Sequence, residues 1–211
     1  MPEQGETEVT VRERASLTER RAETLRLDIA RAALDLFLLD GNTSATVERI
    51  AEAAGVAPRT FYRHFAVKED VVLPLFQRSS NRIAEALRET GDDEPLVDAL
   101  VRSFRAQLDG ERLSAHQRDF LGLMMTNPQY RMRWTEVDGS LRAAVAELLA
   151  SRLHVSGDQF VHQLAAELLT HTGRRAFEEW LTVRRTESID TLLRTGFQLV
   201  LTGLHSSSER S

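Results

Sequence analysis

The sequence predicts an all-α protein, with an N-terminal three-helix domain that contains a helix-turn-helix and a larger C-terminal helical domain, about nine helices in total. Apolar residues recur at three- and four-residue steps in most stretches between breaks, which is the period of an amphipathic helix. No segment shows the alternation of a strand. The 211 residues are 42 % apolar and 28 % charged, a balance typical of a globular protein with a packed core.

The first long helix is expected to follow a loose arm of residues 1–15, which have no apolar period. Ser16-Leu17-Thr18-Glu19 has the capping-box pattern that satisfies the first free amides of a helix. The helix should end before Gly41. Its apolar face consists of Leu25, Ile29, Ala32, Leu36 and Phe37.

Two short helices are expected next. Thr46 can cap a helix over residues 47–53, and Ala54-Gly55-Val56 breaks it. Pro58 suits the first turn of a third helix that runs to about residue 65, because its missing N–H costs nothing there.

The rest of the chain also has a helical pattern. Lys68 begins a longer helix, which Pro74 should kink, and Gly91-Asp92-Asp93-Glu94-Pro95 is the clearest linker. Further helices are expected over residues 95–109, 113–126, 128–153, 158–184 and 188–204. The predicted parts are a flexible arm (1–15), a helix-turn-helix domain (16–68), an effector-binding and dimerisation domain (69–205) and a tail (206–211).

Several protein classes are excluded by what the sequence lacks. It has no cysteine, hence no disulfide or thiolate metal site, and its six histidines are not paired at the spacing of metal ligands. It has no glycine-rich phosphate loop and no Gly-x-Ser-x-Gly elbow, so we expect no enzyme, no metal and no cofactor. The lack of a long apolar run and of a signal peptide predicts a cytoplasmic protein with no membrane partner.

The most informative pattern lies in residues 43–72, where two short helices are joined by a three-residue turn that contains Gly55. The whole chain has a net charge of −5, but residues 43–68 carry four basic residues against two acidic ones, which suits a phosphate backbone. The side chains expected to face a shared core are Ile50, Val56, Phe61 and Phe65. Those left for the outer face of the third helix, which is sized for a major groove, are Arg59, Thr60, Tyr62, Arg63 and His64.

This segment resembles the DNA-binding domain of the TetR family of bacterial transcriptional repressors. The matching residues are Thr46-Val47, Ile50-Ala51, Ala54-Gly55-Val56, Thr60-Phe61-Tyr62-Arg63-His64-Phe65 and Lys68-Glu69. The resemblance is specific over about residues 20–72. It implies a two-domain, all-helical homodimer whose C-terminal domain binds a small-molecule effector that lowers its affinity for DNA.

The resemblance also implies roles for individual residues. Phosphate contacts are implied for Thr46, Tyr62, His64 and Lys68. Base contacts are implied for Arg59, Thr60 and Arg63. Ala57 stands where family members often carry serine, so the third helix lacks a side chain that could cap it.

The C-terminal part has aromatic and methionine side chains at helical spacing. They suit an adaptable apolar pocket, although an ordinary core position is the favoured interpretation for most of them. The candidate effector-binding residues are Phe104, Leu121, Met124, Met125, Tyr130, Trp134 and Phe177. The polar groups expected nearest to such a pocket are His116, Gln117, His162 and His171. Residues 127–134 also resemble the seventh helix of TetR-like regulators with an acyl-CoA-like ligand-binding domain, which implies an acyl-like or other lipophilic effector.

The last helix is expected to form a homodimer together with the helix before it. At about 100° per residue, one apolar stripe consists of Leu193, Phe197, Val200 and Leu204. A second stripe consists of Ile189, Leu192, Gly196, Leu199 and Gly203. Together they are wider than one core requires, and the two glycines would let a partner backbone approach closely. The alternative is a helix buried within its own domain.

The predicted function is therefore that of a DNA-binding repressor, which a small lipophilic effector releases from a palindromic operator in double-stranded DNA. The alternative is an all-helical carrier of a small molecule or lipid, whose helix-turn-helix is structural only. Salt-dependent binding to a palindromic duplex separates the two, because phosphate contacts release counterions.

Overall fold

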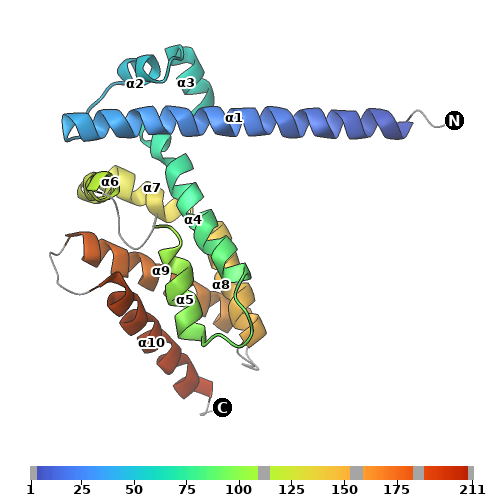
Figure 1. Ribbon diagram of the computed structural model, residues 1–211, viewed down its shortest axis with the longest axis vertical. Coiled ribbons are helices and arrows are strands. Elements are labelled where there is room, and N and C mark those ends of the chain that lie inside the picture. The colour runs from blue at the N-terminus through green and yellow to red at the C-terminus, as the bar shows by residue number, and fades with distance from the viewer. Residues whose placement is uncertain (1–3, 109–114, 153–158, 183–187, 209–211) are drawn as a thin grey trace. The chain divides into compact units, whose positions relative to one another are not determined.

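The computed structural model describes residues 4–108, 115–152, 159–182 and 188–208. These residues form ten α-helices and one short 3-10 helix, with no strand among them, so the predicted all-α class is confirmed (Figure 1). The chain divides into two compact units, Met1–Leu75 (unit 1) and Phe76–Ser211 (unit 2). Within the described ranges, no helix has the length and apolar character needed to cross a membrane.

Unit 1 is a long helix with a helix-turn-helix packed on it. Its elements are α1 (Gln4–Asp40), α2 (Val47–Ala53), α3 (Pro58–His64) and the 3-10 helix η1 (Lys68–Val72). Both α2 and η1 pack on the C-terminal part of α1 and enclose the core (Figure 1). The largest fully buried side chains of this core are Ile29, Phe37, Ile50, Phe61 and Phe65.

The first helix begins earlier than predicted. Residues 4–15, expected as a loose arm, continue α1, so the capping-box sequence at residues 16–19 lies inside the helix and not at its start. The absence of an apolar face indicated an arm, but a polar helix needs no such face. No glycine or proline interrupts the chain between Gly5 and Gly41, so nothing local ends the helix.

The turn between α2 and α3 depends on Gly55. Its φ is +67°, a left-handed conformation that side chains with a Cβ adopt only at a cost. A Cβ at this position would meet nothing within 4 Å, so the backbone conformation and not lack of space requires glycine. The predicted role of Gly55 in the turn is confirmed.

Pro74 does not kink a helix as predicted. Residues 68–72 form the separate 3-10 helix η1, and α4 (Leu73–Arg88) begins one residue before the proline. Pro74 therefore lies in the first turn of α4, where its missing N–H leaves no hydrogen bond unmade.

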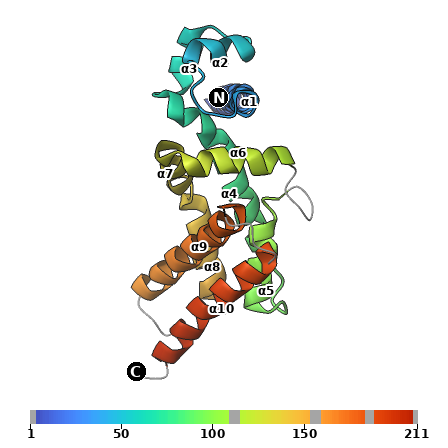
Figure 2. The ribbon, with the colours of Figure 1, turned by 90° about the vertical axis from the view of Figure 1, so that its left-hand side faces the viewer.

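Unit 2 is a bundle around α9. Both α8 and α10 pack along α9, while α6 contacts α9 and α10 also contacts α5 (Figure 2). Its elements beyond α4 are α5 (Leu96–Arg105), α6 (Ala115–Thr126), α7 (Pro128–Glu136), α8 (Gly139–Arg152), α9 (Gln159–Thr182) and α10 (Ile189–Ser208). Three expected breaks, near residues 110, 157 and 186, lie outside the described residues, as do residues 209–211 of the predicted tail.

A single helix over residues 128–153 was predicted, but the structure has two. Helix α7 ends at Glu136 and α8 begins at Gly139. Between them Asp138 is 4 % exposed and forms an ion pair with Arg174 of α9, so a distant residue fixes the break. The spacing of apolar residues within 128–153 does not indicate this contact.

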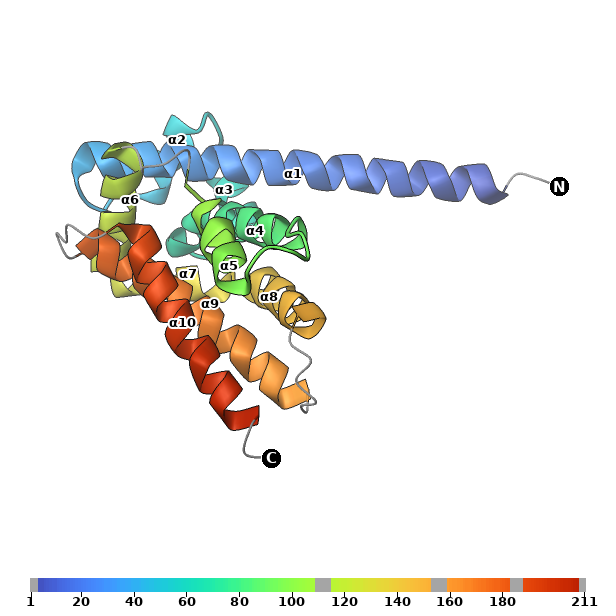
Figure 3. The ribbon, with the colours of Figure 1, turned by 60° about the horizontal axis from the view of Figure 1, so that its bottom comes forward.

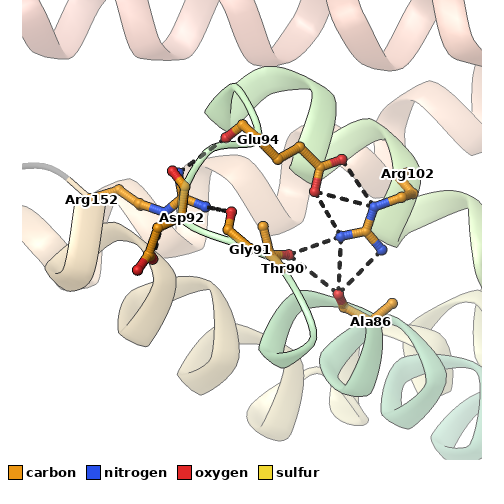
Figure 4. Close-up of polar contacts among 7 residues, drawn as sticks. All are labelled: Ala86, Thr90, Gly91, Asp92, Glu94, Arg102 and Arg152. Atoms are coloured by element: carbon orange, nitrogen blue, oxygen red, sulfur yellow. Dashed lines mark hydrogen bonds and ion pairs between the residues drawn. The ribbon is translucent and has the colours of Figure 1, made fainter.

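The linker between α4 and α5 is held by two arginines (Figure 4). Arg102 of α5 donates to both carboxylate oxygens of Glu94, from Nε at 3.0 Å and from Nη2 at 2.9 Å, and to Thr90 Oγ1 at 3.0 Å. Arg152 of α8 donates to the backbone carbonyls of Asp92 at 2.6 Å and Glu94 at 3.0 Å, and to that of Gly91. The predicted linker is therefore an ordered turn.

Arg102→Met is expected to lower the free energy of unfolding by about 1 kcal/mol, since the pair is partly exposed and screened by solvent. The hydrogen bond from Arg102 holds the pKa of Glu94 below its ordinary value of 4.5. The ionised pair therefore stabilises the fold above that pH, and its contribution is lost as the pH falls through the lowered pKa. Urea denaturation at pH 7 and pH 3.5 should show the difference between wild type and variant shrinking in acid.

The matched control for this experiment is Arg88→Met. Arg88 lies 3.7 Å from Glu147, and both side chains are more than half exposed. Its replacement should change the unfolding free energy by less than about 0.5 kcal/mol. Equal effects of the two variants would contradict the role given to Arg102.

Candidate nucleic-acid interface and ligand cavity

The exposed side of α3 presents three large polar side chains. Arg59 and Arg63 are exposed, and Tyr62 is 56 % exposed, whereas Phe61 between them is completely buried. Phe61 packs against Phe65, with ring centroids 5.0 Å apart. The helix is thus fixed to unit 1 by its apolar side, and Arg59, Tyr62 and Arg63 are available to a partner.

The start of α3 is not capped by a side chain. Ala57 occupies the N-cap position and makes no side-chain hydrogen bond, which confirms the expectation from its sequence, and Pro58 follows in the first turn. Pro58 has no N–H, and the amides of Thr60 and Phe61 donate to the Ala57 carbonyl at 2.8 Å and 3.3 Å, so these positions of the first turn do not need a side-chain cap.

Thr46 and Lys68 already have partners within unit 1. Thr46 caps α2, because its Oγ1 accepts a hydrogen bond from the Arg49 amide at 3.3 Å. Lys68 Nζ donates to the carbonyl of Thr43 at 2.9 Å. An ammonium has three N–H groups, so Lys68 can bind a phosphate while it holds the loop before α2.

Two residues expected on the outer face of α3 are half-buried, Thr60 and His64. The Nε2 atom of His64 is buried and has no hydrogen-bond partner in the part of the chain that the structure describes. Burial, together with the charges of Arg63 and Arg26, lowers the pKa of His64 below 6.5. A neutral imidazole whose Nε2 faces the interior is a poor phosphate ligand in this conformation.

In unit 2, residues from α4 to α9 surround a small cavity, here called the ring cavity. Three of the predicted effector-binding residues line it, Phe104, Trp134 and Phe177. Its volume is about 20 Å³, room for about one water molecule. The full lining is Ser80, Ile83, Phe104, Gln107, Trp134, Asp138, Leu141, Thr170, Arg174 and Phe177.

The other predicted effector-binding residues do not line this cavity. Leu121 is half-buried, and Met124, Met125 and Tyr130 are buried elsewhere in the core of unit 2. His162 and His171, which were expected near the pocket, do not line the cavity either. The side chains of His116 and Gln117 lie outside the described residues.

The polar residues that do line the cavity were missed by sequence reasoning. Arg174 forms an ion pair with Asp138, donates to the carbonyl of Trp134 at 3.0 Å, and lies over the Trp134 ring at 5.4 Å from its centroid. Ser80 Oγ lies 3.4 Å from Asp138 Oδ1. Burial lowers the pKa of Arg174 to about 10, so it remains charged at neutral pH. The sequence did contain one signal, because Arg174 interrupts a stretch in which apolar residues recur at helical spacing.

Gly173 is required by close packing in the same place. A Cβ on Gly173 would clash with the ring of Phe104. Phe104 also packs on Phe197 of α10, with ring centroids 5.1 Å apart. Because Gly173 has no side chain, the Phe104 ring can pack between α5, α9 and α10 beside the cavity.

The α9–α10 pair exposes large apolar side chains. Leu164 and Leu168 of α9 are 41 % and 44 % exposed, and Leu199 of α10 is 76 % exposed. Leu193 and Phe197 of the predicted first stripe are completely buried, so this stripe belongs to the core of unit 2. The predicted second stripe is divided, because Ile189 is buried and Leu199 is not.

The expectation that Gly196 admits a partner chain is wrong. A Cβ on Gly196 would come within 2.5 Å of Thr172 Cγ2, so this glycine lets α10 approach α9 of its own chain. A Cβ on Gly203 would have no atom of the described residues within 4 Å. Leu204 of the first stripe has its side chain outside the described residues.

Comparisons with known proteins match both units. Residues 29–75 match the model of bacterial regulatory proteins of the tetR family, and residues 94–205 match the model of the MftR C-terminal domain. The HTH-type transcriptional regulator TcmR of Streptomyces glaucescens is 34 % identical over 176 residues, which cover 78 % of this chain and 76 % of TcmR. The chain belongs to the TetR family.

Solved structures of other proteins share the fold. GusR of Salmonella enterica is 26 % identical with a TM-score of 0.57, over 85 % of this chain and 96 % of GusR. FadR of Thermus thermophilus, solved with lauroyl-CoA, is 24 % identical with a TM-score of 0.63, over 84 % and 94 % of the two chains. This TetR-family protein is a DNA-binding transcriptional regulator and not an enzyme, as predicted, and the carrier alternative is not favoured.

Proposed function

We propose that this protein binds a palindromic operator as a homodimer in the cytoplasm and represses transcription until a small lipophilic effector releases it. The observation that carries the operator part is the exposed side of α3, where Arg59, Tyr62 and Arg63 stand out from a helix whose other side is buried. A helix held in this way can enter a major groove, where guanidinium groups bind guanine edges.

The candidate DNA contacts fall into two groups. Arg59, Thr60 and Arg63 are proposed to read bases, with Arg63 first because it is exposed near the C-terminal end of α3. The residues proposed to hold phosphates are Thr46, Tyr62, His64 and Lys68. Tyr62 and Lys68 have accessible polar groups for this, whereas His64 must turn its ring outward.

Arg63→Ala is expected to weaken operator binding by about 1–3 kcal/mol and to change binding to random DNA little, because a bidentate base contact is lost. Lys68→Ala should instead weaken all sequences about equally and flatten the salt dependence. Fluorescence anisotropy of operator and random duplexes at several salt concentrations measures both. An unchanged operator-to-random ratio for Arg63→Ala would rule out its base-reading role.

The homodimer is proposed to form through the exposed side of α9 and α10, which run antiparallel and side by side (Figure 3). Gly196 faces Thr172 across the pair. At 100° per residue, Leu168 lies about 40° around α9 from Thr172, and Leu199 about 60° around α10 from Gly196. In antiparallel helices these rotations bring both leucines to the same side, opposite the core. Leu164 and the 64 % exposed Phe160 continue this dimer face along α9.

The effector is proposed to enter unit 2 at the ring cavity. Phe104, Trp134 and Phe177 supply an apolar wall that suits a lipophilic molecule. At about 20 Å³ the cavity is too small for such a molecule, so the effector must displace rings to enter. Leu121, Met124, Met125 and Tyr130, also proposed as effector contacts, would join the lining only in that opened state. A ligand that binds the opened state better shifts the protein toward it.

Trp134 should report effector binding in the Trp180→Phe variant, where it is the remaining tryptophan. Its emission is expected to change with each apolar compound that releases the operator, because the indole contacts the entering molecule. Lauroyl-CoA, the ligand of the T. thermophilus neighbour, is a reasonable first probe. A compound that releases the operator and leaves the Trp134 emission constant would place the effector elsewhere.

A further inference from the structure

Two residues that line the ring cavity each carry a buried hydrogen-bond donor with no acceptor among the described residues. The donors are the hydroxyl of Thr170, in a residue only 4 % exposed, and Nε of Arg174. The two residues are four apart on α9, so they lie on one face of the helix, and both line the cavity. Buried donors of this kind are rare in native proteins because each one loses its hydrogen bonds to water.

We propose that Thr170 and Arg174 bind a neutral carbonyl-type oxygen of the effector, whose apolar part lies against the rings of Phe104, Trp134 and Phe177. A ketone, ester or amide oxygen has two lone pairs and can accept from both donors at once. This inference rests on the proposed function, because it describes the polar end of the effector that unit 2 is proposed to bind.

The charges around the cavity favour a neutral oxygen over a carboxylate. Among the ten lining residues the charged ones are Arg174 and Asp138, which form an ion pair with each other. The Asp138 carboxylate also lies beside the hydroxyl of Ser80. A ligand carboxylate would add a second buried negative charge with no second cation to balance it, and such a charge is strongly unfavourable. Only displacement of Asp138 would make room for an anion.

The apolar part of the ligand follows from the rest of the lining. Ile83 and Leu141 accompany the three aromatic side chains, so five of the ten lining residues offer apolar surface to a ligand. The volume of about 20 Å³ has room for about one water molecule, which would be the competing occupant of the two donors. A ligand gains by replacing that water only if its own oxygen reproduces the hydrogen bonds.

Three small probes of similar shape test this chemistry: acetophenone, ethylbenzene and benzoate. Isothermal titration calorimetry of the full-length protein should give acetophenone the highest affinity. Ethylbenzene lacks the acceptor and benzoate carries the charge, and each should bind about tenfold more weakly or worse. In the Trp180→Phe variant, acetophenone should also shift the indole N–H NMR signal of Trp134. Equal or tighter binding of ethylbenzene or benzoate overturns the proposal, and so does the absence of acetophenone binding, which would leave water as the occupant.

Thr170→Val keeps the side-chain shape and removes the hydroxyl. It is expected to weaken acetophenone binding about tenfold and leave ethylbenzene binding unchanged, and Thr170→Ser should restore the preference. The matched control is Ser103→Ala, since the Ser103 hydroxyl is likewise buried without a partner but does not line the cavity. Unchanged acetophenone binding in Thr170→Val, or an equal loss in Ser103→Ala, contradicts the assignment.

Measuring operator binding by the wild-type protein distinguishes a failure of this inference from a failure of the proposed function. A protein that binds its operator with steep salt dependence but does not prefer acetophenone refutes the carbonyl assignment alone. A protein that prefers acetophenone but does not distinguish operator from random DNA refutes the repressor function alone.

Discussion

Asp138→Ala is expected to lower the free energy of unfolding of unit 2 by about 3–5 kcal/mol, because it leaves Arg174 buried without its counter-ion. The side chains of Arg174 and Asp138 are 9 % and 5 % exposed, so water cannot replace the missing charge. The loss should appear as a lower transition temperature in calorimetry, and the α7–α8 junction should become easier to open. Asp138→Asn, which keeps an acceptor for Arg174, should cost less.

Asp98→Ala is the matched control. Asp98 pairs with Arg194 at 2.6 Å in the same unit, but the side chains are 42 % and 46 % exposed. A surface pair of this kind contributes about 0–1 kcal/mol. If both alanine variants destabilised the protein equally, burial would not be what makes the Arg174–Asp138 pair important.

Leu168→Arg combined with Leu199→Arg is expected to give a folded monomer whose affinity for the operator falls at least about 100-fold. Two linked recognition helices gain this much from binding adjacent half-sites, and a monomer loses the gain. Both leucines are exposed within the subunit, so charges at these positions should not disturb its own core. Sedimentation velocity measures the mass, and anisotropy measures operator binding.

Met132→Arg is the control for the dimer experiment, since Met132 is 57 % exposed on α7 of the same unit. It should remain dimeric and bind the operator as the wild type does. A double variant that stays dimeric would move the interface away from the α9–α10 side chains. Gly196→Arg is not a suitable test, because it would separate α10 from α9 within one chain.

The helix-turn-helix could be predicted because its signals are local. Gly55 marks the turn, Pro58 marks the start of α3, and the apolar spacing separates buried Phe61 from exposed Tyr62 and Arg63. Each of these features acts within a few residues, so the sequence alone contains it. Contacts that the bound DNA would make remain predictions.

The ring cavity could be predicted only in part, because it is assembled from helices far apart in the sequence. Aromatic spacing indicated Phe104, Trp134 and Phe177, but Met124 has the same spacing and belongs to the core. Nothing near Asp138 in the sequence shows that Arg174 will lie beside it. The break between α7 and α8 depends on that pairing and was missed for the same reason.

The contacts of Arg152 with the α4–α5 linker imply that evolution can change most residues of this turn, other than the Glu94 partner of Arg102, more easily than their number. Arg152 binds the main-chain oxygens of Gly91, Asp92 and Glu94, and every amino acid carries such an oxygen. Substitutions at Asp92 would therefore keep the bonds, whereas an inserted or deleted residue would move the carbonyls away from the guanidinium. Homologues should therefore vary in sequence but agree in length across the turn. A tag or reporter domain inserted into this turn because the turn is hydrophilic would break the contact with Arg152.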